Sequence, residues 1–182
     1  PVDEKILEPK AFYSGYEKSK HDAEKLIFKM VKEGGNIVIV NPTRVFGPGP
    51  LVKSNSVTKI IHKYVNGKWR FQPGTGNEIG NYTYIDDVIQ GHFLAMEKGK
   101  AGERYILGGE NLSYSQLINS IAEVHGKKYG LFKIPLGFFN VYGGFSDFLA
   151  DTFSVEPMIT KNWVKKYREN WIVSSAKAQN EL

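Results

Sequence analysis

The sequence predicts an α/β fold, and two observations support that prediction. Segments with the three- and four-residue apolar spacing of a helix alternate along the chain with short β-branched or aromatic segments. The run Ile37–Val40 is apolar at every position, which is typical of a strand buried on both faces of a parallel sheet. Helices alternating with strands in this way are typical of a parallel sheet covered by helices.

The N-terminal half of the chain has the clearest pattern. A helix is expected over residues 11–33, because apolar residues recur there at helical spacing and Gly34-Gly35 then stops it. Pro42 ends the following strand over residues 37–40, and Gly47–Pro50 forms a rigid loop. The elements expected next are a helix over 54–65, strands over 69–72 and 82–85, and a helix that Asp86 or Asp87 caps and that includes Met96.

The C-terminal half continues the alternation. A strand is expected over residues 104–107. Ser113 and Gln116 have the spacing of a capping box, which predicts a helix that begins there and ends near His125. The remaining elements expected are a short edge strand over 132–135, helices over 136–151 and 157–170, and a last helical stub that Ser175 opens.

Composition narrows the function classes. The 182 residues are 41% hydrophobic, enough for a packed core, and no apolar run is long enough to span a membrane. The chain has no Cys, which excludes disulfides and thiolate metal sites and is compatible with a cytoplasmic location. A net charge of +5 permits an anionic ligand, but the charges are scattered, so we expect neither nucleic-acid nor membrane binding. No metal site is expected, because the four histidines are isolated: His21, His62, His92 and His125.

A tyrosine and a lysine four residues apart are the leading candidates for catalysis. Only Tyr16 and Lys20 lie within one continuous predicted helix, where this spacing puts both side chains on one face. A neighbouring ammonium stabilises a phenolate, so Tyr16 could pass a proton to or from a substrate oxygen. The alternative is an ordinary surface pair. The same spacing recurs at two places where a helix stop or a strand separates the residues: Tyr64/Lys68 and Tyr129/Lys133.

A second candidate is the segment Asn41–Gly49, which follows the predicted buried strand. Ligands of open α/β sheets bind beyond the carboxyl ends of the strands, and the prolines of this segment hold its backbone groups in place. A rigid connection without a ligand is the alternative. The sequence contains no Gly-x-Gly-x-x-Gly, since Gly74-Thr75-Gly76 is followed by Ile79 where the third glycine would stand. The fingerprint of a dinucleotide pyrophosphate site is therefore missing.

Taken together, these segments resemble the extended short-chain dehydrogenase/reductases, the NAD(P)-dependent epimerase/dehydratase superfamily. The resemblance covers essentially the whole chain and is closest to the dihydroflavonol-reductase-like branch. It rests on the order of five segments: Tyr16-x-x-Ser19-Lys20 with Ala23-Glu24, Asn41–Gly49, Tyr84–Val88, Gly102–Glu110 and Ser174–Leu182.

The resemblance implies roles for particular residues. Tyr16 would be the general acid/base, and Lys20 would favour its phenolate and hold the ribose hydroxyls of NAD or NADP. The nicotinamide would face a second group of residues: Pro42, Thr43, Arg44 and Val45. The expected substrate is a small carbonyl compound or alcohol. A nucleotide-sugar epimerase or dehydratase is the alternative, although Gly80-Asn81 stands where such members often carry a basic residue. A non-catalytic binding module or inactive fragment is the alternative of another class.

The resemblance also implies a domain organisation. Residues 1–53 would be the end of a Rossmann-like doubly wound parallel sheet, with the catalytic helix. Residues 54–182 would be mostly a small α/β substrate-binding subdomain, from which about 81–98 return to the sheet. The glycine-rich half and the family's catalytic Ser have no counterpart, because Ser14 is too close to Tyr16. We therefore expect the C-terminal part of such an enzyme, inactive alone, that associates with a missing N-terminal segment or a second copy.

Overall fold

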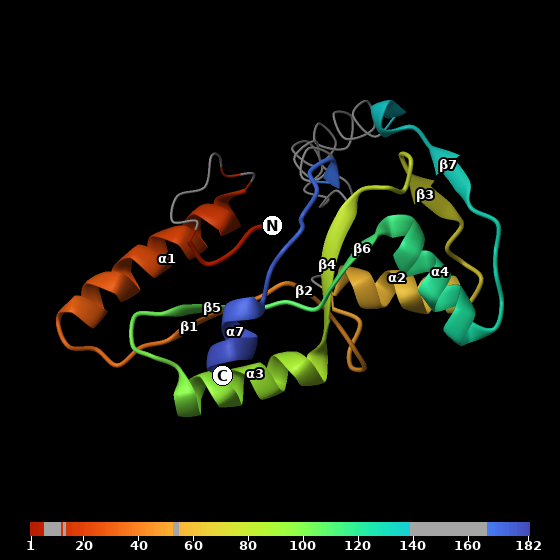
Figure 1. Cartoon of the computed structure of the whole chain (residues 1–182). Coiled ribbons are helices and arrows are strands. Elements are labelled where there is room, and N and C mark those ends of the chain that lie inside the picture. Colours follow the sequence, from red (N-terminus) through yellow and green to blue (C-terminus); the bar gives the residue numbers. More distant parts are fainter. Residues whose placement is uncertain (6–11, 13, 53–54, 139–166) are drawn as a thin grey trace. The chain divides into compact units, whose positions relative to one another are not determined.

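The computed structural model of the protein describes residues 1–5, 12, 14–52, 55–138 and 167–182 (Figure 1). The chain divides into two compact units. The first consists of Pro1–Lys59, Asn81–Asn111 and Trp171–Leu182, and the second of Ile60–Gly80 and Leu112–Asn170. Residues 81–111 and 171–182 thus belong to the same compact unit as the N-terminal residues.

Parallel strands organise the first unit. Strand β1 (Ile39–Pro42) pairs with β5 (Arg104–Leu107), and β2 (Arg44–Phe46) pairs with β4 (Ile79–Tyr84), both in parallel. Parallel neighbours so far apart in sequence are typical of helix-connected α/β sheets, and the α/β prediction is confirmed. The helices of this unit are α1 (Gly15–Lys32), α3 (Ile85–Lys98) and α7 (Ala176–Glu181), and β6 (Glu110–Ser113) lies next to β4.

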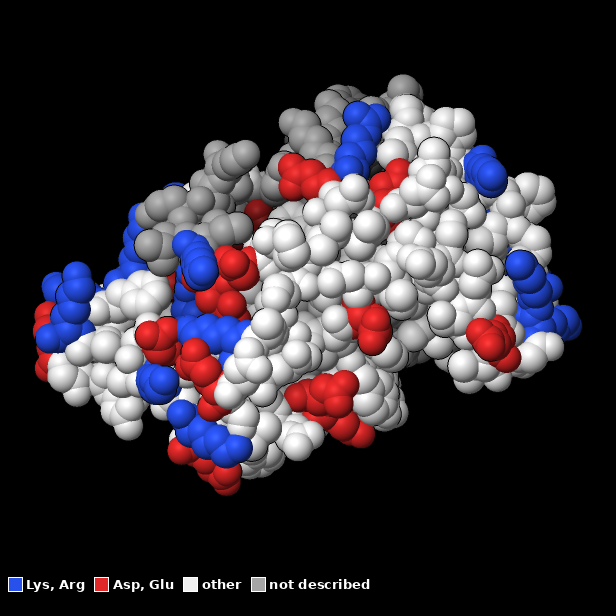
Figure 2. Space-filling view, in the orientation of Figure 1, with Lys and Arg blue, Asp and Glu red and all other residues white. Residues whose placement is uncertain are grey.

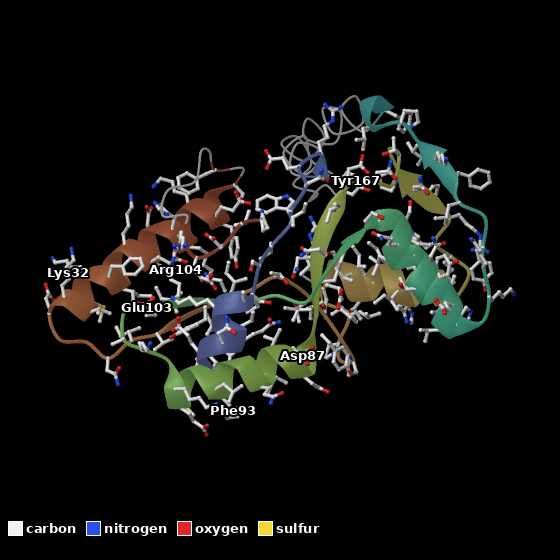
Figure 3. All side chains as sticks on the ribbon, in the orientation of Figure 1. Lys32, Asp87, Phe93, Glu103, Arg104 and Tyr167 are labelled. Atoms are coloured by element: carbon white, nitrogen blue, oxygen red, sulfur yellow. The ribbon has the colours of Figure 1, made fainter. Side chains whose placement is uncertain are left out.

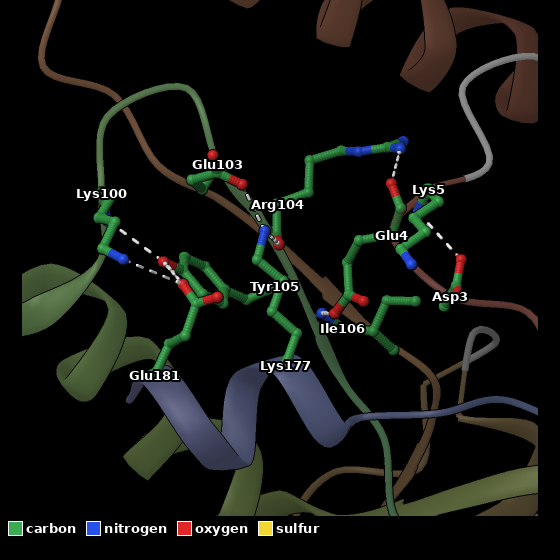
Figure 4. Close-up of polar contacts among 10 residues, drawn as sticks. All are labelled: Asp3, Glu4, Lys5, Lys100, Glu103, Arg104, Tyr105, Ile106, Lys177 and Glu181. Atoms are coloured by element: carbon green, nitrogen blue, oxygen red, sulfur yellow. Dashed lines mark hydrogen bonds and ion pairs between the residues drawn. The ribbon is translucent and has the colours of Figure 1, made fainter.

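The core of the first unit lies where α3 and α7 meet the β1–β5 pair. Its buried members come from one strand and two helices: Val88, Tyr105, Leu107 and Ala178. Polar contacts add to this packing, because the Tyr105 hydroxyl donates to Glu181 Oε2 at 3.0 Å and Lys177 bonds both Glu103 and the Arg104 carbonyl (Figure 4). The last helix is thereby held on β5.

The second unit is smaller and more aromatic. It contains α2 (Ser56–Val65) from Ile60 onward, β3 (Phe71–Pro73), α4 (Tyr114–His125) and β7 (Phe132–Ile134), with β3 and β7 paired in parallel. Tyr64 and Tyr114 form its core with Ile118 and Ala122. The indole N–H of Trp69 donates to the Tyr114 hydroxyl at 2.6 Å, and that hydroxyl donates to the Phe71 carbonyl at 2.8 Å. Buried hydroxyls therefore have partners.

Most of the expected elements are confirmed, with shifted ends. The helices α1, α2, α4 and α7 lie where periodicity and capping predicted them. The capping box is present, with Ser113 Oγ accepting from the Gln116 N–H and Gln116 Oε1 accepting from the Ser113 N–H. The helices expected over 136–151 and 157–170 lie mostly outside the described residues.

Two expectations about the N-terminal half are wrong in detail. The strand expected at 37–40 occupies Ile39–Pro42, because its position is set by pairing with Arg104–Leu107; only Ile39 of it is buried, against the expected burial on both faces. The residues 44–46, expected as loop, form β2, because they pair with Tyr82–Tyr84 of β4.

The expected capping role of Asp86 or Asp87 is also wrong. Tyr84 is the N-cap of α3 and makes no side-chain capping bond. Strand β4 leads directly into the helix at Ile85, so Asp86 and Asp87 both fall in its first turn, where the positive end of the helix dipole favours a carboxylate. Figure 3 shows Asp87 at this end of α3. Among the described residues, no helix is both long and apolar enough to cross a membrane.

Candidate active site

Tyr16 and Lys20 lie together on the first turns of α1. Ser14 is the N-cap of this helix, and its Oγ accepts from the Glu17 N–H at 3.3 Å. The Lys20 ammonium lies 5.4 Å from the centroid of the Tyr16 ring, so the predicted shared face is confirmed. The Tyr16 side chain is 69% exposed, which leaves its hydroxyl accessible to a ligand.

The other two pairs with the same spacing do not share a helix face. Tyr64 is fully buried in α2 and its hydroxyl accepts from the Tyr129 N–H, whereas Lys68 follows the end of that helix. Tyr129 follows α4, and Lys133 lies in β7. Of the three pairs, only Tyr16 and Lys20 therefore lie on one helix with neighbouring side chains.

Lys18 and Lys20 of α1 have different partners. The Lys18 ammonium lies 2.9 Å from Asp22 Oδ2, and this hydrogen bond lowers the pKa of the Asp22 carboxyl. Lys18 is thus engaged by a carboxylate one turn along the helix. The Lys20 ammonium instead lies over the Tyr16 ring.

Glu24 attaches this helix to the sheet, a role that the sequence analysis did not assign. Its Oε1 accepts from Asn41 Nδ2 at 3.0 Å, and its Oε2 lies 3.2 Å from Arg104 Nη1. The Arg104 and Glu24 side chains are only 14% and 19% exposed, so this ion pair is largely shielded from water. Glu24 lies one turn beyond Lys20, and that i, i+4 spacing was the signal available in the sequence.

The segment Pro42–Val45 crosses from β1 to β2. Pro42 ends β1, Val45 packs against the core of the unit, and the Arg44 guanidinium lies 5.6 Å from the Tyr82 ring centroid. Thr43 Oγ1 donates to Asn81 Oδ1 at 2.7 Å and lies 2.6 Å from Thr83 Oγ1. These two buried partners are the other residues that the sequence analysis missed.

The loop after this segment is held closely against α3. A Cβ added to Gly47 would lie 2.2 Å from Cγ2 of Ile85, so only glycine fits here. The Gly47 N–H donates to Thr58 Oγ1 at 3.2 Å. The four backbone positions from Pro42 to Val45 thus follow a rigid path between a strand pair and a tightly packed turn.

The described residues contain no group of His, Asp or Glu that could hold a metal ion. The candidate site of the first unit consists of the Tyr16 phenol, the Lys20 ammonium and the segment Pro42–Val45, which begins at the carboxyl end of β1. In an open parallel sheet this is the side on which ligands bind.

Comparison with known proteins assigns the chain to a family. Residues 1–108 match the NAD dependent epimerase/dehydratase family, and the chain belongs to that family. A putative dihydroflavonol 4-reductase from Synechocystis is 28% identical over 100% of this chain and 53% of that protein. Sterol demethylase protein B from Methylococcus capsulatus is 30% identical over 66% of this chain and 35% of that protein.

Solved structures support the same assignment. The structure of gox2253 matches with a TM-score of 0.72 and 29% identity over 100% of this chain and 55% of that chain. The Bordetella bronchiseptica enzyme WbmF, solved in complex with NAD+, has the same fold with a TM-score of 0.63 and 22% identity over 71% of this chain and 44% of that chain. The chain spans about half the length of the first relatives that it matches.

Proposed function

We propose that this chain supplies the proton-transfer pair of an NAD(P)-dependent reductase acting on a small carbonyl compound or alcohol. The observation that carries the proposal is the Tyr16–Lys20 pair on one exposed helix face, with the ammonium 5.4 Å from the ring. Its family membership and its similarity to the Synechocystis protein support this reaction class.

The residues present fit the nicotinamide end of such a cofactor. A phenol and an ammonium are suitable hydrogen-bonding partners for ribose hydroxyls, and both belong to the accessible face of α1. Pro42–Val45 supply backbone groups at the carboxyl end of β1, where ligands of parallel sheets bind. When bound, the nicotinamide supplies or accepts the hydride.

The residues of the chain then have defined tasks. During carbonyl reduction, the Tyr16 hydroxyl donates its proton to the substrate oxygen as that oxygen gains negative charge. The Lys20 ammonium stabilises the phenolate left behind. In the oxidation direction the same phenolate removes the proton from the alcohol. Glu24 keeps both groups beside the sheet through Asn41 and Arg104.

A nucleotide-sugar dehydratase or epimerase is the second candidate. The observation that favours it is a dTDP-D-glucose 4,6-dehydratase from Dictyostelium discoideum, which is 29% identical over 66% of this chain and 28% of that protein. The Tyr16–Lys20 pair suits this chemistry as well, since it also begins with removal of a hydroxyl proton. Substrate panels that contain both small carbonyls and nucleotide sugars separate the two.

The decisive variant is Tyr16→Phe, which removes one hydroxyl and keeps the ring. We expect turnover to fall about 100-fold or more while the Kd for NADH or NADPH changes less than about threefold, because the lost group transfers a proton. Tyr84→Phe is the matched control, since Tyr84 is a 38% exposed tyrosine on a different element. Nicotinamide fluorescence measures binding, and loss of absorbance of the reduced cofactor measures turnover.

The assay uses the chain and also a chimera in which the chain replaces the matching 53% of the Synechocystis protein. Full activity of Tyr16→Phe in either form would contradict the role of Tyr16. Binding without turnover of any carbonyl or nucleotide sugar by either folded wild-type form would favour a non-catalytic binding module.

A further inference from the structure

The polypeptide changes its strand neighbour at a single residue, Thr43. The preceding strand β1 pairs with β5, and the following strand β2 pairs with β4. The Thr43 N–H still donates to the Leu107 carbonyl of β5 at 3.2 Å, whereas Arg44 is already in register with Tyr82 of β4. The direction of the backbone from Thr43 to Val45 therefore depends on how Thr43 is held between the two strand pairs.

Two buried polar residues of β4 hold the side chain of Thr43. Asn81 and Thr83 are two residues apart, so they lie on the same face of the strand, and each is 2% exposed. Asn81 Oδ1 lies 2.7 Å from Thr43 Oγ1, and Thr83 Oγ1 lies 2.6 Å from it. A buried polar side chain lowers stability unless it is hydrogen bonded. The bonds to Thr43 therefore help to offset the cost of burying Asn81 and Thr83.

The amide of Asn81 is fixed from its other side. Its Nδ2 donates to the Gly109 carbonyl at 2.9 Å and to Asn111 Oδ1 at 3.0 Å, while its Oδ1 also accepts from the Gly109 N–H at 2.9 Å. A rotated amide would place its NH₂ group against the Gly109 N–H, so only one orientation satisfies these partners. The backbone of Gly109 can approach β4 this closely because glycine has no Cβ. An added Cβ would lie 2.2 Å from the Tyr82 carbonyl oxygen.

The hydrogen of the Thr43 hydroxyl is consequently committed. Asn81 Oδ1 can only accept, so Thr43 donates to it. Thr83 directs its own hydrogen to Thr43 Oγ1 or to the Leu107 carbonyl, which lies at 3.3 Å. Thr43 thus has no hydroxyl hydrogen left for a ligand, and what it offers a cofactor is the position of the backbone around it.

We propose that Asn81 is a positioning residue for cofactor binding: it sets the backbone of Thr43–Val45 through the Thr43 hydroxyl, without touching the cofactor. The cofactor part of this inference rests on the proposed function. It also gives a task to Asn81, which stands where nucleotide-sugar members of the family often carry a basic residue.

The positioning itself is tested in the unliganded chain by hydrogen exchange. Asn81→Ala removes both ends of the amide, and Thr43→Val removes the hydroxyl with little change of shape. Either is expected to speed amide exchange at Thr43–Val45 about tenfold, the change that corresponds to one lost hydrogen bond. Thr43→Ser keeps a hydroxyl and should restore slow exchange. An increase below about twofold in a folded Thr43→Val chain would overturn the proposal.

A control separates this effect from general loosening. Asn111 bonds Asn81, and its amide also pairs with both the N–H and the carbonyl of Val173 at 2.9 Å. In Asn111→Ala, Asn81 keeps both of its bonds to Gly109 and its bond to Thr43, so exchange should speed up at Val173 much more than at Thr43–Val45. Equal acceleration at Val173 and at Thr43–Val45 would mean that the loosening is general and would overturn the specific role of Asn81.

Titration with NADH and NADPH then tests the cofactor part. The Kd should rise about tenfold in Asn81→Ala and in Thr43→Val, and no further in the double variant, because both remove the same bond. Additive losses, or a loss confined to Thr43→Val, would show direct contact by Thr43 and overturn the proposal. A wild-type chain and chimera that bind neither nucleotide would instead contradict the proposed function, while the exchange result on Asn81 would stand on its own.

Discussion

The two compact units differ in the balance of their charged residues. Among the described residues the first unit has twelve Lys and Arg against twelve Asp and Glu, whereas the second has seven against three. Four ion pairs join described residues within the first unit. On the face drawn in Figure 2, basic and acidic groups accordingly alternate over the α1 and β5 region.

Both units also place basic groups over aromatic rings, as Lys20 and Arg44 do in the first unit. The Arg70 guanidinium lies 3.9 Å from the centroid of the Tyr129 ring, and the ammonium groups of Lys127 and Lys63 lie 5.1 Å and 5.9 Å from the Tyr129 and Trp69 rings. In the second unit, the hydroxyls of the buried tyrosines bond the backbone: Tyr114 donates to the Phe71 carbonyl, and Tyr64 accepts from the Tyr129 N–H. The comparison teaches that the second unit is stabilised mainly by its aromatic core. The first unit adds a buried polar network, formed by Thr43, Asn81 and Thr83, beside the candidate active site.

The largest effect is expected from the aromatic core of the second unit. Tyr64→Ala removes a fully buried ring that packs edge to face on Tyr129, and should lower the free energy of unfolding of this unit by about 3–5 kcal/mol. Amide exchange of α4 measures the loss, and exchange of β5 serves as the reference in the first unit. Equal loss of protection in β5 would contradict the separation of the two cores.

The next effect concerns the close backbone approach in the first unit. Gly109→Ala would bring a Cβ to 2.2 Å from the Tyr82 carbonyl oxygen, and we expect a loss of about 1–3 kcal/mol in the free energy of unfolding, as for overpacking. Gly130→Ala is the control, because no atom lies within 4 Å of its added Cβ. Urea unfolding of both variants checks this, and similar midpoints would show that the polar network around Asn81 tolerates displacement.

The sequence predicted helices well where periodicity or capping acts locally. The helix α4 and its capping box are examples, since Ser113 and Gln116 are only three residues apart. The strand β2 and the partners of Thr43 could not be found in this way, because Asn81 lies 38 residues further along the chain. The dipeptide Gly80-Asn81 is typical of a loop, so its sequence gives no sign that the Asn81 side chain is buried. That burial follows from strand pairing, which brings Asn81 to its partners. Tyr16 and Lys20 were predicted because their relation is local, whereas Glu24 contacts Arg104 across 80 residues.

The ion pair of Glu24 should contribute less to stability than the packing of Tyr64 or the close approach at Gly109. The helix α1 has no buried residues, so Glu24 is a main attachment to the sheet. Glu24→Gln removes the charge and turns a donor toward Arg104, and we expect about 1–2 kcal/mol less protection of α1 against amide exchange, the value of a hydrogen bond to a charged group. Glu33→Gln, at the end of the same helix, is the control. Unchanged protection in Glu24→Gln would mean that packing alone holds the helix.

The smallest effect is the pH dependence of the Glu103–Lys177 pair that helps hold α7 on β5 (Figure 4). The hydrogen bond from Lys177, with its charge, lowers the pKa of the Glu103 carboxyl below the ordinary 4.5. A carboxyl with a depressed folded-state pKa contributes stability that is fully present above 4.5 and is lost as the pH falls through its folded-state value. The Glu103 side chain is 47% exposed, so solvent screening limits the contribution to less than about 1 kcal/mol.

Lys177→Met should therefore be less stable than wild type at pH 7, and the difference should shrink below pH 4.5. Urea unfolding across this range measures it, and a difference that grew on acidification would reverse the sign of the coupling.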